Sequence, residues 1–237
     1  MNPQKQRKID ALLQQGYSLD AVRCIQEGWE ILKQNLGSFI GFTLLTVLLS
    51  FVSLCFCFIP FIFAGNLFAG PYSVSMKILK RQPVTFENFF DGFRNSNFPQ
   101  ILLTTLVIGA ITTVVYIPVY AIQLFINLSS DSLNDPKLLA IYGLATLVGW
   151  VAVIAISIIY VFAVPLILDQ RLEFWPAMEL SRKIASQRWG SFLGLFILLQ
   201  LLNFAGALLC GLGLLLTTPL YFCAITAAYH QVIGLDD

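Results

Sequence analysis

The chain has 237 residues, of which 57% are hydrophobic and only 11% are charged. Soluble globular domains carry about 25% charged residues, so this composition excludes an ordinary soluble domain and predicts one compact domain in a membrane. The formal net charge is +1, and no tract combines basic with aromatic residues, so nucleic acid is not an expected partner.

Six long apolar stretches follow a polar N-terminal segment, residues 1–17, whose lack of an apolar core predicts that it is not a cleavable signal peptide. Each stretch reaches the roughly 20 residues needed to cross a bilayer. We expect spans near 36–58, 61–79, 101–126, 138–168, 191–210 and 212–233. Short turns at Ile59-Pro60 and at Gly211 suggest hairpins. The predicted fold class is therefore all-α, a polytopic bundle of six transmembrane helices in three hairpins, forming a single domain over 18–237.

Basic residues lie on alternating connections between these stretches. Thirteen of the fourteen precede the first span, separate the second from the third, or separate the fourth from the fifth. They are Lys5, Arg7, Lys8, Arg23, Lys33, Lys77, Lys80, Arg81, Arg94, Arg171, Arg182, Lys183 and Arg188. Because cytoplasmic loops carry an excess of Lys and Arg, we expect a multi-pass protein of the cell membrane with both termini in the cytoplasm.

Each basic connection also contains a segment with the spacing of an amphipathic helix. The apolar faces consist of Val22, Ile25, Trp29, Leu32 and Leu36; of Phe86, Phe89, Phe90 and Phe93; and of Trp175, Met178 and Ile184. Ser18 is the expected N-cap of the first segment, and Thr85 precedes the second. We expect these helices to lie in the cytoplasmic headgroup layer, the alternative being a cap packed under the bundle.

A repeated glycine pattern opens the first and fifth spans, at Gly37-Ser38-Phe39-Ile40-Gly41 and Gly190-Ser191-Phe192-Leu193-Gly194. GxxxG spacing lets helix backbones approach closely. We expect the two copies to pack within one molecule, the alternative being a homodimer interface.

Prolines at positions 71, 118, 165 and 219 interrupt the predicted spans, since each removes a helical hydrogen-bond donor. The stretch 138–168 is too long for a straight crossing, so we expect it to kink at Pro165 or to protrude. Two interpretations of these prolines remain open. They only kink the helices, or they frame a polar site, as broken helices do in transporters. That site would contain Pro71, Pro165, Pro219, Asn66, Ser73, Thr217 and Thr218.

Catalytic and metal-binding patterns are lacking in the sequence, so we assign no catalytic, cofactor-binding or metal residue. The one histidine, His230, has no nucleophile pattern near it, and we expect a structural role. Gln200 and Asn203 are expected to join helices by hydrogen bonds. The five cysteines show no CxxC spacing, and a disulfide between Cys57 and Cys210 is a minor alternative. The acids Glu87, Asp91, Asp169, Glu173 and Glu179 are expected on solvated helix faces, where they could gather a cation.

Three segments together resemble a known group of proteins. They are 29–39 (WEILKQNLGSF), 89–93 (FFDGF) and 179–183 (ELSRK). The pattern resembles bacterial six-span membrane proteins of unknown function, which are similar to the membrane domain attached to some glycerophosphodiester phosphodiesterases. The soluble phosphodiesterase domain has no counterpart here, so the resemblance implies neither that activity nor any functional residue.

Two functions from different classes fit these observations. The first is a non-enzymatic membrane module that binds lipids or a protein partner, whose partners are the phospholipid bilayer and a further protein or a second copy of the chain. The second is a small solute transporter or channel that uses the proline-broken helices. An enzyme acting at the inner membrane surface is a third and weaker hypothesis.

Overall fold

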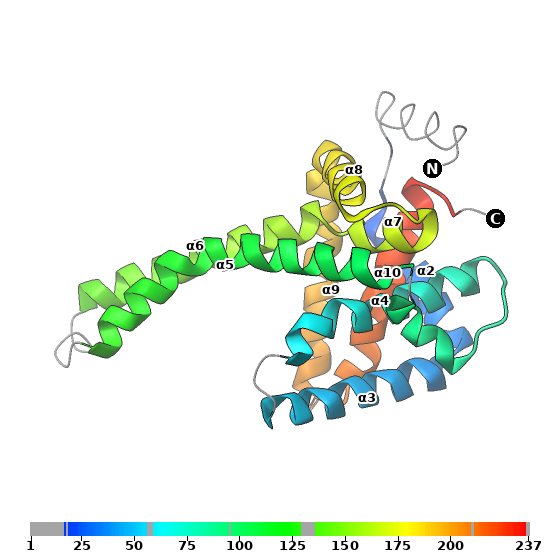
Figure 1. The fold of residues 1–237 in the computed structure, drawn as a ribbon, viewed down its shortest axis with the longest axis horizontal. Helices are drawn as coiled ribbons and strands as arrows, with labels where there is room; N and C mark the ends of the chain where they lie inside the picture. Colours follow the sequence, from blue (N-terminus) through cyan, green and yellow to red (C-terminus); the bar gives the residue numbers. More distant parts are fainter. Residues whose placement is uncertain are drawn as a thin grey trace. The chain divides into compact units, whose positions relative to one another are not determined.

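The structure is a computed structural model that describes residues 17, 19–55, 59–94, 96–128, 136–209 and 211–235. All regular structure in these ranges is helical (Figure 1), which confirms the all-α prediction. In chain order the elements are α2 (Ala21–Gln34), α3 (Leu36–Cys55), α4 (Ile59–Leu79), the 3₁₀ helix η1 (Phe86–Phe93), α5 (Phe98–Leu128), α6 (Pro136–Ile159), α7 (Ala163–Gln170), α8 (Phe174–Gln187), α9 (Trp189–Leu208) and α10 (Leu214–Val232).

Each of the six ranges that were predicted to be spans contains a helix within the described residues. By length and composition, three helical stretches can cross a membrane: Phe98–Leu128, Pro136–Gln170 and Trp189–Leu208. A fourth is added if α2 and α3, which meet at 93°, form one broken span. These stretches indicate a membrane protein.

The two helices α4 and α10 are not among those stretches, and both pack inside the bundle. Polar residues such as Asn66 in α4 and His230 in α10 lower their hydropathy. Ten residues of α10 are buried, and α10 contacts α2, α3, α4 and α9. A helix surrounded by other helices can carry polar side chains, because its neighbours supply their hydrogen bonds.

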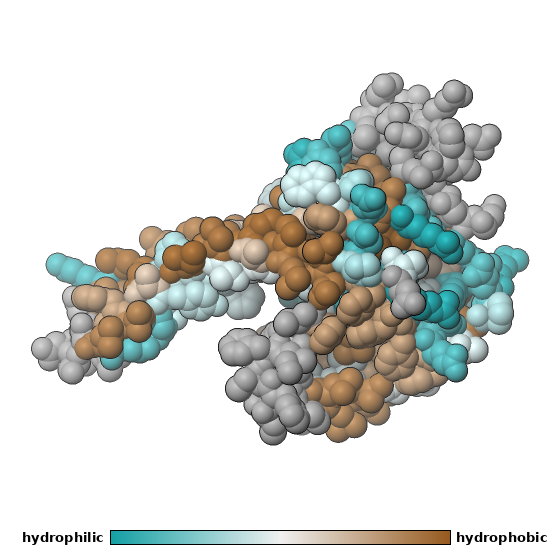
Figure 2. All heavy atoms as spheres, viewed as in Figure 1, coloured by the Kyte–Doolittle hydropathy of each residue, from teal (hydrophilic) through white to brown (hydrophobic). Residues whose placement is uncertain are grey.

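The described residues form two compact units. The first comprises the parts of Met1–Thr105 and Ile159–Asp237 that the structure describes, and the second is Leu106–Ile158. In the second unit, α6 packs on α5 where Gly149 faces Tyr116 and Val119. Apolar side chains such as Leu144 and Val151 are exposed there, and hydrophobic residues cover much of the visible surface of α5 and α6 (Figure 2). The division runs within α5, so it leaves the predicted single domain over 18–237 untested.

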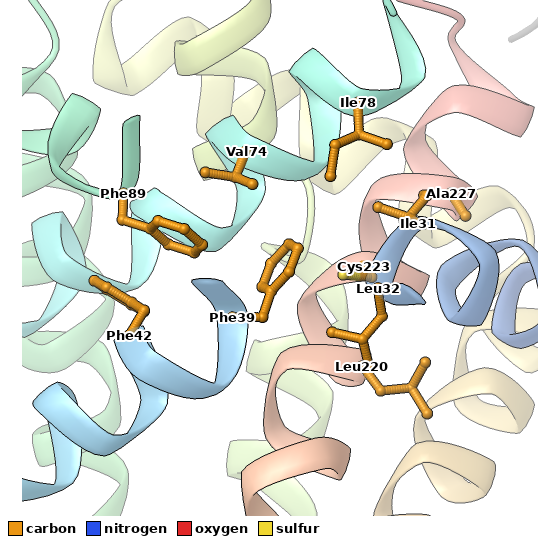
Figure 3. Close-up of a cluster of buried hydrophobic side chains, with 10 residues drawn as sticks. All are labelled: Ile31, Leu32, Phe39, Phe42, Val74, Ile78, Phe89, Leu220, Cys223 and Ala227. Atoms are coloured by element: carbon orange, nitrogen blue, oxygen red, sulfur yellow. The ribbon is translucent and has the colours of Figure 1, made fainter. Parts of the chain in front are cut away.

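The core of the first unit joins α2, α3, α4, η1 and α10. Figure 3 shows its ten buried side chains, which are Ile31, Leu32, Phe39, Phe42, Val74, Ile78, Phe89, Leu220, Cys223 and Ala227. The ring of Phe89 stacks on Phe42 at a centroid distance of 4.6 Å and meets Phe39 edge to face at 5.2 Å. Each such ring pair contributes about 0.5–1.5 kcal/mol beyond the area it buries. The core therefore fixes η1 against α3 and α4.

The repeated glycines do not meet, so the predicted packing of the first span on the fifth is wrong. A Cβ added at Gly37, Gly190 or Gly194 would find no atom of another described segment within 4 Å, and one at Gly41 would only reach Phe86, at 3.9 Å. GxxxG spacing presents a smooth helix face, but burial depends on which face the neighbouring helices cover.

Close backbone approaches occur at other glycines. A Cβ on Gly28 of α2 would lie 2.7 Å from the backbone nitrogen of Ala224 in α10. A Cβ on Gly70 of α4 would overlap the carbonyl of Phe89. At the turn between α9 and α10, Gly211 has φ of +77°, which a side chain would disfavour, in agreement with the turn predicted there.

The predicted fourth span is interrupted before Pro165. Residues 160–162 form a turn between α6 and α7, just before Pro165. The hydroxyl of Ser181 in α8 accepts a hydrogen bond from the Phe162 N–H and donates one to the Ile159 carbonyl, at 3.1 and 2.8 Å. This side chain therefore satisfies backbone groups that the interruption leaves without helical partners.

Helix α2 packs on the bundle mainly through a face other than the apolar face identified in the sequence, and Leu32 belongs to both. Cys24, Gly28, Ile31 and Leu32 are buried, whereas Val22 and Trp29 are exposed. The sequence carries two apolar faces, and the small residues allow the closer approach to α10. The N-cap is Asp20, whose side chain accepts hydrogen bonds from the N–H groups of Val22 and Arg23. The predicted cap, Ser18, lies outside the described residues, as do Cys57, Cys210 and most of the loop between α5 and α6.

Candidate functional site

The first candidate site begins with a buried carboxylate on η1. Asp91 Oδ2 accepts hydrogen bonds from Ser73 Oγ at 2.5 Å and from Lys77 Nζ at 2.7 Å, and its Oδ1 lies 3.0 Å from Arg94 Nε. Helical spacing places Ser73 and Lys77 on one face of α4. The backbone N–H of Thr85 donates to Asn88 Oδ1 at 2.9 Å, which stabilises the start of η1. Through its contacts with Lys77 and Arg94, Asp91 therefore orients two cations.

A second buried carboxylate lies at the end of α7. Asp169 Oδ1 pairs with Lys80 Nζ at 3.0 Å, and Asp169 Oδ2 accepts a hydrogen bond from the Tyr229 hydroxyl at 2.9 Å. Gln170 Nε2 donates to the same hydroxyl at 3.2 Å. The Asp169 side chain is 0% exposed, against 20% for Lys80. This network joins α4, α7 and α10.

A polar cavity of about 300 Å³ lies beside both carboxylates. Four basic and two acidic side chains line it: Lys77, Lys80, Arg94, Arg171, Asp91 and Asp169. Arg171 caps α7 in the left-handed conformation, with φ of 53°, which is uncommon for a residue with a side chain. Basic charges exceed acidic ones around the cavity, so its potential favours anions.

The prediction that the five acids lie on solvated helix faces is therefore wrong for Asp91 and Asp169. Glu87 and Glu173 are exposed, as predicted. Glu179 is half-buried, and its hydrogen bond to Arg182 lowers the pKa of its carboxyl. No group of three His, Cys, Asp or Glu residues within the described ranges is arranged to hold a metal ion.

The second candidate site is an apolar groove of about 490 Å³ between α3, α4 and α10. It is lined by Phe39, Phe42, Thr43, Leu44, Thr46, Val47, Ser50, Phe68, Pro71, Gly211, Leu212, Leu214, Leu215, Thr218, Pro219 and Phe222. The hydroxyls of Thr43, Thr46 and Ser50 donate to carbonyls four residues earlier in α3, at 2.8 to 2.9 Å. These polar groups are satisfied locally, so the groove suits an apolar ligand.

The hypothesis of a polar site framed by prolines is not supported. Pro71 and Pro219 line the apolar groove. Asn66 instead donates to the carbonyls of Gly92 and Phe98, at 2.7 and 3.1 Å, and so joins α4 to η1 and to the start of α5. Thr217 lies against Gly206 of α9.

Several exposed aromatic residues lie on the segments that were predicted to be amphipathic. They are Trp29, Phe86, Phe90, Phe93 and Trp175. Of the four phenylalanines of η1 only Phe89 is buried, so the segment packs against the bundle and still exposes three rings. In α8, Met178 and Ile184 are buried and Trp175 is exposed.

The remaining polar candidates take no part in either site. Gln200 is exposed and Asn203 is half-buried in α9, and neither bonds another helix among the described residues. His230 is exposed near the end of α10, beside Gln231, which accepts a hydrogen bond from the Cys24 thiol at 3.2 Å.

Comparisons with protein-family models, with curated proteins and with solved structures found no match for this chain. The resemblance to the membrane domains of glycerophosphodiester phosphodiesterases therefore stays a prediction.

Proposed function

We propose that the chain is a non-enzymatic, six-span membrane module that binds a membrane lipid by holding an acyl chain in the groove between α3, α4 and α10. The observation that carries this proposal is the apolar lining of the groove, whose α3 hydroxyls are already satisfied. Its volume of about 490 Å³ falls within the range of roughly 300–1,000 Å³ that is usual for ligand pockets.

Surrounding residues favour a lipid over a soluble apolar ligand. Leu44, Val47 and Leu48 of α3 are exposed beside or within the groove lining. A soluble protein seldom leaves such a surface in water, whereas lipid tails accept it. An acyl chain can therefore enter the groove from the surrounding leaflet without crossing water.

Contacts among the basic connections support three hairpins inserted in the same direction. Tyr17, before the first span, donates a hydrogen bond to the Ile184 carbonyl in the connection between the fourth and fifth spans, at 2.7 Å. Lys80, after the second span, pairs with Asp169 at the end of the fourth. These contacts join the segments that charge assigns to the cytoplasm. In this arrangement the exposed tryptophans Trp29, Trp175 and Trp189 lie at headgroup level, where tryptophan is enriched.

Filling the groove tests the proposal. Leu215 lines it, and Leu215→Trp should displace the chain. Leu201→Trp on α9 is the matched control, because Leu201 is exposed and lies outside the groove. After detergent extraction and delipidation, phospholipid retained per protein is measured by mass spectrometry. We expect retention by the wild type and by Leu201→Trp and loss from Leu215→Trp; equal retention by all three would contradict the proposal.

A solute transporter is the second candidate, because the helix interruption at 160–162 leads into α7, which ends at the buried Lys80–Asp169 pair. Ionisable residues buried in membrane proteins often mark ion or proton pathways. Saturable solute flux into liposomes that contain the protein, and none into protein-free liposomes, would favour transport over lipid binding.

A further inference from the structure

We propose that the cavity between α4, η1 and the end of α7 binds a phosphate group. The cavity stands apart from the acyl-chain groove. Pro71, which lines the groove, and Ser73, which lines the cavity, point about 160° apart around α4. The two sites can therefore be tested separately.

The buried carboxylates hold the lysines with donors to spare. Lys77 donates to Asp91 and Lys80 donates to Asp169. An ammonium group has three N–H donors, so each lysine keeps donors for a ligand. Because Asp91 and Asp169 are buried and engaged by other groups, they orient the cations more than they repel an incoming anion.

The two arginines complete the phosphate site. Arg94 meets Asp91 through Nε, and its terminal nitrogens, which no described residue engages, can bind two oxygens of one phosphate. Arg171 forms no ion pair with any described residue, and it lies where α7 ends. The four cationic side chains thus outnumber the carboxylates of Asp91 and Asp169. The cavity carries a net positive charge, which suits a phosphate anion.

Phosphate can come from an anionic lipid headgroup or from solution, and the chemistry of the site is the same for both. Basic pockets at the cytoplasmic ends of transmembrane helices commonly bind anionic headgroups. The test therefore uses both sources, with the full chain reconstituted in nanodiscs of phosphatidylcholine alone or of phosphatidylcholine with phosphatidic acid.

Arg171→Gln is the test variant. Arg81→Gln is its matched control, since Arg81 also follows a helix with a left-handed φ, of 56°, but does not line the cavity. Binding of phosphatidic acid is measured by native mass spectrometry, and binding of inorganic phosphate by calorimetry in phosphatidylcholine nanodiscs at constant ionic strength. Arg94→Gln is a second variant, because the Arg94 side chain is 65% exposed and its removal leaves Asp91 paired with Lys77.

The proposal is supported if either probe binds and if Arg171→Gln and Arg94→Gln each weaken that binding by about tenfold. Arg81→Gln should leave the binding unchanged. Binding of phosphatidic acid alone would identify a lipid headgroup as the source of the phosphate. Binding of inorganic phosphate alone would identify a soluble ligand. Binding of neither probe, or equal weakening in Arg81→Gln, would overturn it. Leu215→Trp should leave phosphate binding unchanged, so failure of the groove and failure of the cavity give different results.

Discussion

Lys80 and Asp169 form an ion pair with 3.0 Å between Nζ and Oδ1, although 89 positions separate them in the chain. The pair joins the end of α4 to the end of α7, and the Tyr229 hydroxyl adds α10 to the same carboxylate. Three helices from distant parts of the sequence thus meet at one buried charge, beside the cationic cavity.

Asp169→Asn should strongly destabilise the protein, because Lys80 and Tyr229 would both lose the buried carboxylate that they contact. Breaking a buried pair from one side costs about 3 kcal/mol or more. Thermal unfolding in detergent measures the effect, with the exposed Glu173→Gln as the control. A transition temperature for Asp169→Asn equal to that of the control would show that the pair contributes little.

Gly70→Val should destabilise the bundle, whereas Gly194→Val should not. A side chain on Gly70 would overlap the carbonyl of Phe89, but one on Gly194 meets no described segment within 4 Å. Overpacking of this kind typically costs about 1–3 kcal/mol. Both variants are compared by thermal unfolding. If Gly194→Val were the less stable of the two, the packing of α9 would have to be revised.

Cys24 should make stability fall at alkaline pH. Burial raises the pKa of the Cys24 thiol to about 12 in the folded chain, whereas an exposed thiol in the unfolded chain loses its proton near pH 8.5. The folded state then binds more protons, so the free energy of unfolding decreases as pH rises from about 8.5 towards 12. Cys24→Ala should show a smaller decrease over that range. An unchanged pH dependence of thermal unfolding would contradict a buried thiol.

Cysteine labelling tests the six-span topology. In a variant without native cysteines, a cysteine replacing Ser130 should react with an impermeant maleimide in intact cells, because the connection near Lys137 is predicted to face outward. A cysteine replacing Ser96 should react only after lysis. The reverse pattern would overturn both the orientation and the proposed hairpins.

Helix positions could be predicted from sequence because length and hydropathy are local properties. Each of the six predicted ranges contains a helix, and the interruption at residues 160–162 includes Val161, whose carbonyl the ring of Pro165 would crowd in a regular helix. Which face of a helix is buried depends on its neighbours. Hydropathy alone therefore identified the apolar face with Val22 and Trp29, whereas Cys24 and Gly28 make the close contacts of α2 with α10.

The candidate sites were harder to predict. Asp91 and Asp169 read as solvated acids, since nothing local pairs them with Lys77 and Lys80. One signal was available: each acid lies on a connection rich in basic residues, and Asp169 directly follows a long apolar run. The groove depends on the mutual placement of α3, α4 and α10, which is a long-range property that hydropathy does not contain.

The most direct test of lipid binding is photo-crosslinking in nanodiscs with a phospholipid that carries a diazirine on its acyl chain, followed by peptide mass spectrometry. We expect adducts concentrated on groove residues of α3 and α10, such as Val47 and Thr218, and their loss in Leu215→Trp. Adducts spread evenly over the exposed faces of α5, α6 and α9, and unchanged in Leu215→Trp, would contradict a bound acyl chain.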